Sequence, residues 1–268
     1  MPVRARLLNA LSERHRRGRG TVADDSEGRC GQGGAAVTMN RREFTNIAKG
    51  WEFIENAALV NESDDLTRLR EQAGETGFTP GSASQADFLA FEARQLDARS
   101  VIILGTGAIM ESLHLMAGLD RLPDADARQL TVVDSLAAGA SAIREIISGM
   151  RFDVRLRIVN AKADVFLPRL NDDDYDLVII SGDEQNYADA YDQAHRLLRA
   201  GGVLMLCDAL ALENADSRGG LLNPSDRCGK ATRMRQLIDF AMADERFSSS
   251  VVPIGTGMIL SLKLPEQA

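Results

Sequence analysis

The sequence predicts an α/β protein with a doubly wound, mostly parallel sheet whose last strand is antiparallel. From Val101 onward, short β-branched runs alternate with segments of helical period, which is the pattern of a parallel sheet covered by helices. The first run breaks into Gly105-Thr106-Gly107 and then into a helix-compatible segment, as when a parallel strand delivers a backbone loop to a ligand. The chain closes with two strands joined by Gly255-Thr256-Gly257, which predicts a hairpin.

Composition narrows the class of protein. The 268 residues suffice for a full core, and no apolar run approaches the ~20 residues needed to span a bilayer. The first residues hold too few apolar side chains for a secretory signal, so we expect none. Cys30, Cys207 and Cys228 form neither a disulfide framework nor a metal-binding spacing, which favours a reducing cytosol. The net charge is −8, with about +5 on residues 1–20. The acidic remainder argues against a nucleic-acid partner, and we expect no membrane partner either.

Two segments precede the sheet. Residues 1–40 are rich in Arg, Gly, Ser and Asp without a sustained period, so we expect a disordered tail. Residues 41–98 carry apolar residues at helical spacing and predict helices over about 44–60, 64–73 and 84–95. We interpret these helices as a lid or dimerisation layer rather than part of the sheet, and the amphipathic first helix predicts a homodimer.

The α/β domain of this prediction occupies residues 99–268. Strands after the first are expected at about 130–133, 154–159, 176–180 and 203–207, and the helices between them at about 136–149, 162–170 and 186–199. Gly201-Gly202 is expected to end the last of these helices. The polar segment 208–226 predicts a loop, followed by a helix over about 228–243 and the hairpin strands 249–254 and 258–264.

Several of these pieces together resemble the bacterial S-adenosylmethionine (SAM)-dependent O-methyltransferases related to the catechol and caffeoyl-CoA enzymes. The resemblance covers roughly residues 56–264 and rests on the order and spacing of short anchors. These anchors are Thr79-Pro80, Val101 to Ala108, Leu130 to Asp134, Ala161-Lys162-Ala163, Tyr175 to Ile180 and Leu197 to Val203. The methyltransferase version of the sheet ends in a reversed strand, so the closing hairpin argues against a nucleotide-dependent oxidoreductase.

The resemblance implies SAM as the cofactor. Gly105 and Gly107 would let the backbone approach its amino-acid end, and Thr106 would add a hydroxyl to the same loop. Asp134 ends the second strand, where a carboxylate can accept both ribose hydroxyls; alternatively, it caps the helix that begins at Leu136. The other matching positions are Thr79, which would cover the methionine moiety, Lys162 and Ala163 at the adenine edge, and Ser181 after the fourth strand.

Three positions depart from the pattern of the family. Where its members have an acidic residue, a third glycine and a small hydroxyl residue, this chain has Ile103, Ile109 and Glu111. A carboxylate that faces the cofactor's own carboxylate would repel it. Either Glu111 turns away to solvent, or the charged end of the cofactor lies differently, or binding is weak.

The metal site of the family is also altered. The relatives bind a divalent cation through an Asp after the fourth strand and an Asp-Asn pair after the fifth. Here those positions fall on Ser181 and Cys207-Asp208, or on Asp208-Ala209 after a shift of one residue. One carboxylate with a hydroxyl and a thiol supplies too few hard oxygens for magnesium, so we predict no catalytic metal.

Methyl transfer to a phenol without a metal needs a general base or close alignment of the reacting atoms. Asp208 is the first candidate for the base, and Asp183, which could instead cap the following helix, is the second; Tyr187 is a further guess. We expect His114 to have a packing or surface role. The resulting hypothesis is a SAM-dependent O-methyltransferase of a small cytosolic acceptor, and the alternative is a catalytically inactive methyltransferase-like binding or scaffold protein.

Overall fold

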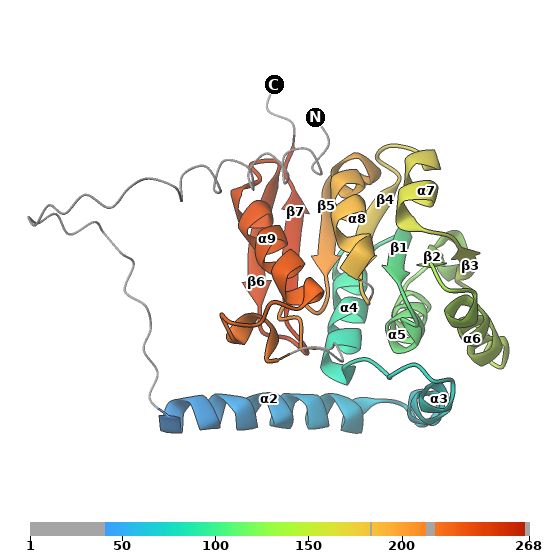
Figure 1. The fold of residues 1–268 in the computed structure, drawn as a ribbon. Coiled ribbons are helices and arrows are strands. Elements are labelled where there is room, and N and C mark those ends of the chain that lie inside the picture. Colours follow the sequence, from blue (N-terminus) through green and yellow to red (C-terminus); the bar gives the residue numbers. More distant parts are fainter. Residues whose placement is uncertain (1–40, 183, 213–217, 266–268) are drawn as a thin grey trace, which may run out of the picture.

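The computed structural model describes residues 41–182, 184–212 and 218–265, so the tail predicted over residues 1–40 and the candidate Asp183 lie outside the described residues. The described strands form one seven-stranded sheet in the order β3-β2-β1-β4-β5-β7-β6 (Figure 1). They are β1 (Ser100–Gly105), β2 (Gln129–Asp134), β3 (Arg155–Asn160), β4 (Tyr175–Ile180), β5 (Leu198–Leu206), β6 (Phe247–Val252) and β7 (Met258–Lys263). Strands β1 to β5 are parallel, and β7 pairs antiparallel with β5 and β6, which confirms the predicted sheet and closing hairpin.

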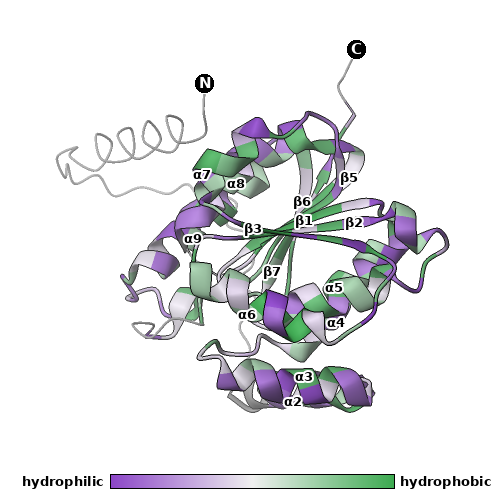
Figure 2. Cartoon of the chain, turned by 90° about the vertical axis from the view of Figure 1, so that its right-hand side faces the viewer, coloured by the Kyte–Doolittle hydropathy of each residue, from purple (hydrophilic) through white to green (hydrophobic). Residues whose placement is uncertain are grey.

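Helices cover both faces of this sheet. They are α2 (Arg41–Asn61), α3 (Asp64–Glu75), α4 (Ala83–Gln95), α5 (Ile109–Leu119), α6 (Ala137–Ser148), α7 (Ala163–Phe166), α8 (Glu184–Leu197) and α9 (Gly229–Ala243). Figure 2 shows α4, α5 and α6 on one side of the sheet and α7, α8 and α9 on the other, with α2 and α3 outside the first group.

The central strands are buried on both faces. Val101 and Ile103 of β1 belong to the hydrophobic cluster beneath α4, α5 and α6, whereas Ile102 and Leu104 belong to the cluster beneath α7, α8 and α9. Successive side chains of a strand point to opposite faces, so one apolar run serves both clusters. A ligand can therefore reach these strands only at their ends, and in such sheets it does so at the carboxyl ends.

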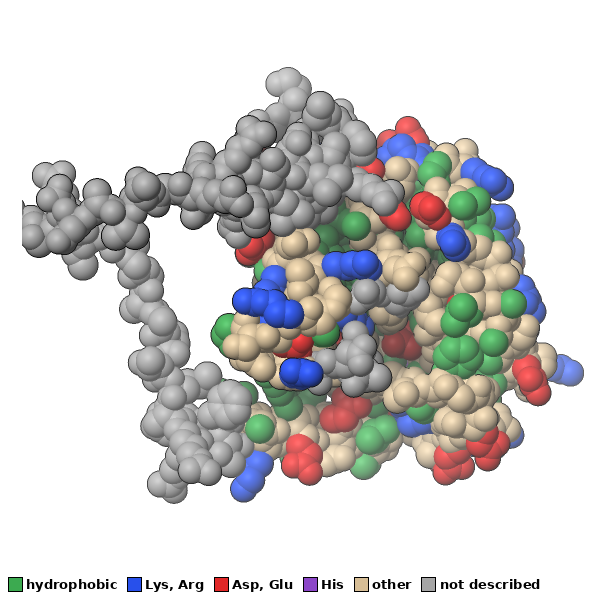
Figure 3. Space-filling view, viewed as in Figure 1, with side chains coloured by type: hydrophobic (Ala, Val, Ile, Leu, Met, Phe, Trp, Pro, Cys, Tyr) green, Lys and Arg blue, Asp and Glu red, His purple; other side chains and the backbone are tan. Residues whose placement is uncertain are grey.

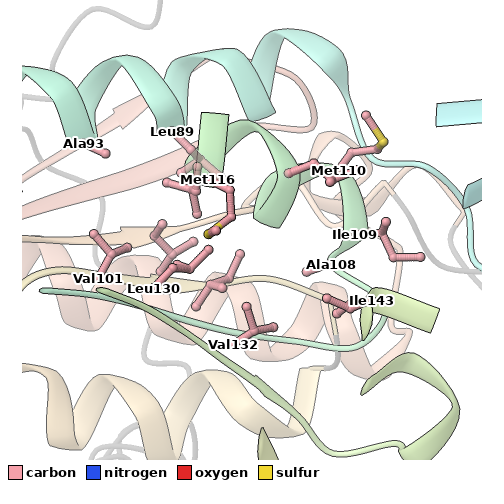
Figure 4. Close-up of a cluster of buried hydrophobic side chains, with 14 of the residues drawn as sticks. Leu89, Ala93, Val101, Ala108, Ile109, Met110, Met116, Leu130, Val132 and Ile143 are labelled. Atoms are coloured by element: carbon pink, nitrogen blue, oxygen red, sulfur yellow. The ribbon is translucent and has the colours of Figure 1, made fainter. Parts of the chain in front are cut away.

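Helix α4 packs directly on one face of the sheet, in the same layer as α5. Leu89 and Ala93 of α4 lie in the same cluster as Val101 of β1 (Figure 4). Gly118 lets α5 approach α4 closely, since a Cβ there would lie 3.0 Å from the Cβ of Ala90. The lid or dimerisation role stays a prediction for α2, α3 and α4.

Two elements have bounds that differ from the prediction for identifiable reasons. The helix expected over 162–170 is the short α7 followed by a 3-10 turn over Leu167–Arg169, because Pro168 has no backbone N–H to continue an α-helix. Strand β5 begins earlier than predicted, since Leu198 already pairs with Tyr175 before a register shift. The expectation that Gly201-Gly202 ends a helix is therefore wrong, because both glycines lie within the strand.

The surface carries charges of both signs. On the face seen in Figure 3, acidic and basic side chains are interspersed, and exposed hydrophobic side chains form small separate groups. None of the helices in the described ranges is both long and apolar enough to cross a membrane.

Candidate active site

The glycine loop follows β1 at the carboxyl edge of the sheet. Gly107 has a φ of +65°, a backbone conformation that favours glycine. A Cβ added to Gly107 would lie 2.6 Å from the Cγ of Phe78, so the ring of Phe78 covers the loop. Phe78 lies between α3 and α4, next to the predicted Thr79, which is itself exposed. Sequence reasoning chose Thr79 for its place in the family motif, and only the packing singles out Phe78.

Asp134 ends β2 beside this loop and is fully buried. Its Oδ2 accepts a hydrogen bond from the Gly107 N–H at 2.9 Å, and its Oδ1 accepts one from the Leu136 N–H at 2.7 Å, just before α6. Gly139 leaves room for the carboxylate, since a Cβ there would lie 2.8 Å from the Asp134 Cγ. Burial raises the pKa of Asp134 above its usual value, and the two backbone hydrogen bonds oppose that shift. The carboxylate thus caps the turn into α6 and clamps the glycine loop, while its role toward a ribose stays a prediction.

The loops after β1 and β4 lie against each other. A Cβ at Gly105 would be 3.4 Å from the Ser181 carbonyl oxygen, and one at Gly182 would be 2.9 Å from the Thr106 nitrogen. The half-buried Thr106 hydroxyl lies 3.4 Å from the hydroxyl of Ser135. The structure thus brings the predicted Gly105, Thr106, Gly107, Asp134 and Ser181 to one place.

The two predicted adenine-edge residues lie further along the edge. Lys162 is the exposed N-cap residue of α7, after β3, and Ala163 is buried as the first residue of that helix.

The three departures from the family pattern have structural explanations. Ile103 and Ile109 are buried in the hydrophobic cluster beneath α4, α5 and α6, where Ile109 shares the cluster with Ile143 of α6 (Figure 4). Glu111 is only 5% exposed, and a Cβ at Gly81 would lie 2.6 Å from its Oε1. The alternative that Glu111 turns to solvent is therefore wrong, because the carboxylate is enclosed beneath the segment before α4.

Asp208 follows β5 and is buried, with a positive φ of +53° that is uncommon for a non-glycine residue. Its carboxylate forms an ion pair with the ammonium of Lys230 on α9. The ammonium contacts Oδ2, and Oδ1 has no hydrogen-bond partner in the described part of the chain. The Lys230 ammonium also donates to the Gly182 carbonyl oxygen at 3.2 Å, so it links the segments after β4 and β5.

The sequence pointed to Tyr187 as a candidate but not to Lys230. The buried Tyr187 hydroxyl donates to the Cys207 carbonyl oxygen at 2.9 Å, which places this secondary candidate beneath the end of β5 as a support. Sequence reasoning missed Lys230, because nothing in the local pattern of α9 connects it to a distant strand end.

The described residues at this end do not fit the divalent cation that the family resemblance implies. The Asp208 carboxylate faces an ammonium, and a cation bound there would be repelled by it. Among the described residues, no group of three or more His, Cys, Asp or Glu side chains is arranged to hold a metal ion.

A second buried cluster anchors the covering segment. The Glu62 carboxylate pairs with Arg70, and its Oε1 lies 3.0 Å from the His114 Nε2 on α5. Arg70 also donates to the Gly81 carbonyl oxygen at 2.8 Å. Desolvation lowers the pKa of His114, although the nearby Glu62 carboxylate opposes that shift. Desolvation alone would raise the pKa of Glu62, but hydrogen bonds from Arg70 and His114 bring the pKa of Glu62 below its usual value. The predicted packing role of His114 thus includes a polar contact.

A surface cavity of about 250 Å³ lies where α2, the start of α4 and the β6–β7 turn meet. Trp51, Glu55, Ser82 and Gly255 contribute to its walls. These walls include neither Asp134 nor Asp208, so the cavity is not the strand-end site itself.

The chain is similar to known proteins over most of its length. The family described as O-methyltransferase matches residues 56–264. A curated relative from Mycobacterium ulcerans that bears an O-methyltransferase name is 27% identical over 208 residues, which cover 76% of this chain and 87% of that protein.

Solved structures give the same fold. The O-methyltransferase TomG from Streptomyces achromogenes, involved in tomaymycin synthesis and solved in complex with SAM, superposes with a TM-score of 0.67 at 17% identity over 81% of this chain and 98% of its own. The O-methyltransferase from Bacillus cereus in complex with SAH has a TM-score of 0.64 at 16% identity, covering 80% of this chain and 99% of its own. These likenesses support the fold, and the family match from residue 56 to residue 264 shows that the chain belongs to the O-methyltransferase family.

Proposed function

We propose that this protein transfers the methyl group of SAM to an oxygen of a small cytosolic acceptor, without a divalent metal. One observation carries the proposal: the glycine loop, Asp134 and Asp208 converge on the carboxyl edges of the neighbouring strands β2, β1, β4 and β5. Ligands bind at this edge in doubly wound sheets. Family membership supports the reaction class, and the SAM complex of the structural relative TomG supports the cofactor.

The residues at the strand ends match this cofactor in position and chemistry. Gly107 would offer its backbone to the cofactor once Phe78 moves aside, and Gly105 keeps the neighbouring backbone free of a side chain. Asp134 offers a carboxylate for ribose hydroxyls in exchange for its bond from the Gly107 N–H. When bound, SAM supplies a methyl carbon activated by the neighbouring sulfonium.

Asp208 is the residue that we propose as the general base. Its carboxylate is buried and contacts the Lys230 ammonium through Oδ2, whereas Oδ1 has no hydrogen-bond donor in the described part of the chain. An acceptor hydroxyl would satisfy Oδ1. The carboxylate takes the hydroxyl proton before the acceptor oxygen is methylated, and releases it to solvent afterwards. Asp183, the second candidate, lies outside the described residues.

A specific observation also favours the second candidate function, a binding protein without catalysis. Both oxygens of Asp134 are already bonded to backbone N–H groups, and Phe78 lies on the glycine loop. A protein that kept this arrangement at all times would hold no SAM, so cofactor binding separates the two functions.

Titration calorimetry with SAM and S-adenosylhomocysteine provides that test. We expect micromolar binding by the wild type and at least about tenfold weaker binding by Asp134→Ala, because a charge-assisted hydrogen bond contributes about 1.5–3 kcal/mol. Asp176→Ala is the matched control, since Asp176 also accepts two backbone N–H groups, from Arg99 and Ser100, but at the opposite edge of the sheet. Absence of wild-type binding at millimolar ligand would overturn the proposal in favour of the non-catalytic one.

The oligomeric state belongs to the same proposal. Several hydrophobic side chains of α2 are exposed, namely Ile47, Phe53, Ile54, Leu59 and Val60. An amphipathic helix with such an exposed face supports a homodimer.

A further inference from the structure

The Lys230–Asp208 pair lies where the chemistry of the proposed reaction needs positive charge. Lys230 is buried, and its ammonium contacts the Asp208 carboxylate after β5 and the Gly182 carbonyl oxygen after β4. The Lys230 ammonium therefore connects the carboxyl ends of the neighbouring parallel strands β4 and β5.

This placement is unfavourable as a purely structural device. Lys230 is the second residue of α9, which has Cys228 as its N-cap residue. Helix N-termini carry partial positive charge and disfavour a cation. Burying a charge pair costs desolvation that the pair's attraction only partly offsets, and well-packed apolar residues often serve stability equally well.

We propose that Lys230 is the built-in cation of the acceptor site and supplies the positive charge that the family resemblance assigns to a divalent metal. The inference rests on the proposed function and deepens it. It assigns to Lys230 an electrostatic and positioning role: the ammonium holds the Asp208 carboxylate in place before reaction and stabilises the acceptor oxygen during it.

The charges balance in each state of this scheme. Before transfer, the ammonium is paired with the Asp208 carboxylate. The acceptor O–H bond then breaks and its proton passes to Asp208, which becomes neutral, so the ammonium now faces the negative acceptor oxygen. That oxygen forms the new C–O bond while the C–S bond breaks and its electron pair stays on sulfur. Lys230 keeps its proton throughout, and no metal or oxidant is needed.

A second buried lysine provides a matched control. Lys263 on β7 also contacts a carboxylate, Asp173 at 2.7 Å, and a backbone carbonyl oxygen, that of Leu198 at 2.6 Å. Leu198 begins β5 and Asp173 precedes β4, so this pair lies at the amino edge of the sheet, away from the site. Replacing either lysine by Met removes a buried charge, but only Lys230 faces the proposed chemistry.

The experiment compares wild type, Lys230→Met, Lys230→Arg and Lys263→Met. The probe is 4-nitrocatechol, a phenol whose absorbance reports its ionisation, added in the presence of S-adenosylhomocysteine. We expect wild type and Lys230→Arg to bind it as the anion at a pH where it is neutral in solution. Lys230→Met should lose this spectral shift, and Lys263→Met should keep it. With SAM, kcat should fall about 100-fold in Lys230→Met with little change in the calorimetric affinity for SAM.

Metal dependence is measured in the same preparation. Wild-type turnover should survive EDTA, and Mn²⁺ followed by electron paramagnetic resonance should show no site that Asp208→Asn removes. Loss of turnover on chelation, Mn²⁺ binding that depends on Asp208, or an unchanged spectral shift in Lys230→Met would each overturn the role of Lys230. The Mn²⁺ measurement needs no SAM, so it decides the inference even if SAM fails to bind and the proposed function falls.

Discussion

At the scale of single residues, the site is organised by close contacts around glycines. Gly107 combines a left-handed backbone with direct contact to the Phe78 ring, and its N–H donates to Asp134. Gly107 has no side chain, and this allows the backbone conformation of the loop, the contact with Phe78 and the hydrogen bond to Asp134.

Gly107→Ala is expected to lower the free energy of unfolding by about 3 kcal/mol, from the strained φ and from overlap with Phe78. Gly201→Ala isolates the backbone component, because Gly201 has a φ of +79° and open space around it; it should cost only about 1 kcal/mol. Urea unfolding measures both. In a Phe78→Ala background, Gly107→Ala should cost no more than Gly201→Ala; an undiminished cost would show that Phe78 is not the obstacle.

At the scale of elements, α2 is held to the body of the molecule through the start of α4. The Glu55 carboxylate accepts hydrogen bonds from the Ala83 N–H at 2.5 Å and the Ser84 N–H at 3.2 Å, and from the hydroxyls of Ser82 and Ser84, both at 2.7 Å. A residue of one helix thus caps the N-terminus of another. Desolvation would raise the pKa of Glu55, but these hydrogen bonds bring it below its usual value.

Glu55→Ala is expected to detach α2 before the rest of the fold unfolds. The free energy of unfolding of this attachment should fall by about 2 kcal/mol, because several charge-assisted hydrogen bonds to the start of α4 disappear together. Limited proteolysis followed by mass spectrometry should show faster cleavage within α2. Glu52→Ala is the control, since Glu52 is exposed on the same helix. Equal cleavage of the two variants would contradict the capping role.

At the scale of the whole molecule, α2 and α3 lie along the carboxyl edge of the sheet (Figure 1), and buried charges join them to the α5 layer. The pKa of His114 is lowered from its ordinary value of 6.5 by burial. The unfolded chain therefore takes up a proton more readily than the folded one as the pH falls below about 6.5, and stability present above that pH is lost in acid. Glu62, whose pKa is also lowered, adds a loss of the same sign at lower pH.

We expect the free energy of unfolding to decrease between pH 7.5 and pH 5.5 by an amount on the order of 1 kcal/mol, because a tenfold difference in proton affinity between the folded and unfolded chains corresponds to about 1.4 kcal/mol. His114→Asn keeps a donor for Glu62 without the titration, so its slope over this range should be smaller. Urea unfolding at several pH values provides the measurement. Parallel slopes for the two proteins would show that His114 does not carry the effect.

Local sequence was sufficient for most of the fold. Short apolar, β-branched runs predicted β1, β2 and β4, and the turn at Gly255-Thr256-Gly257 predicted the hairpin. These predictions succeed because strand and turn formation depend on residues that are close together in the sequence. The same reasoning placed Gly105, Asp134 and Asp208 at strand ends, and parallel pairing brings strand ends to one edge.

Only the tertiary structure decided what surrounds those residues. Phe78 on Gly107, Glu111 beneath Gly81 and Lys230 beside Asp208 each join elements that are distant along the chain. No periodicity or spacing encodes such contacts, since they arise from how whole helices pack against the sheet. The sequence by itself therefore determined which strand ends form the candidate site, and packing determined that Asp134 is buried and that a lysine accompanies Asp208.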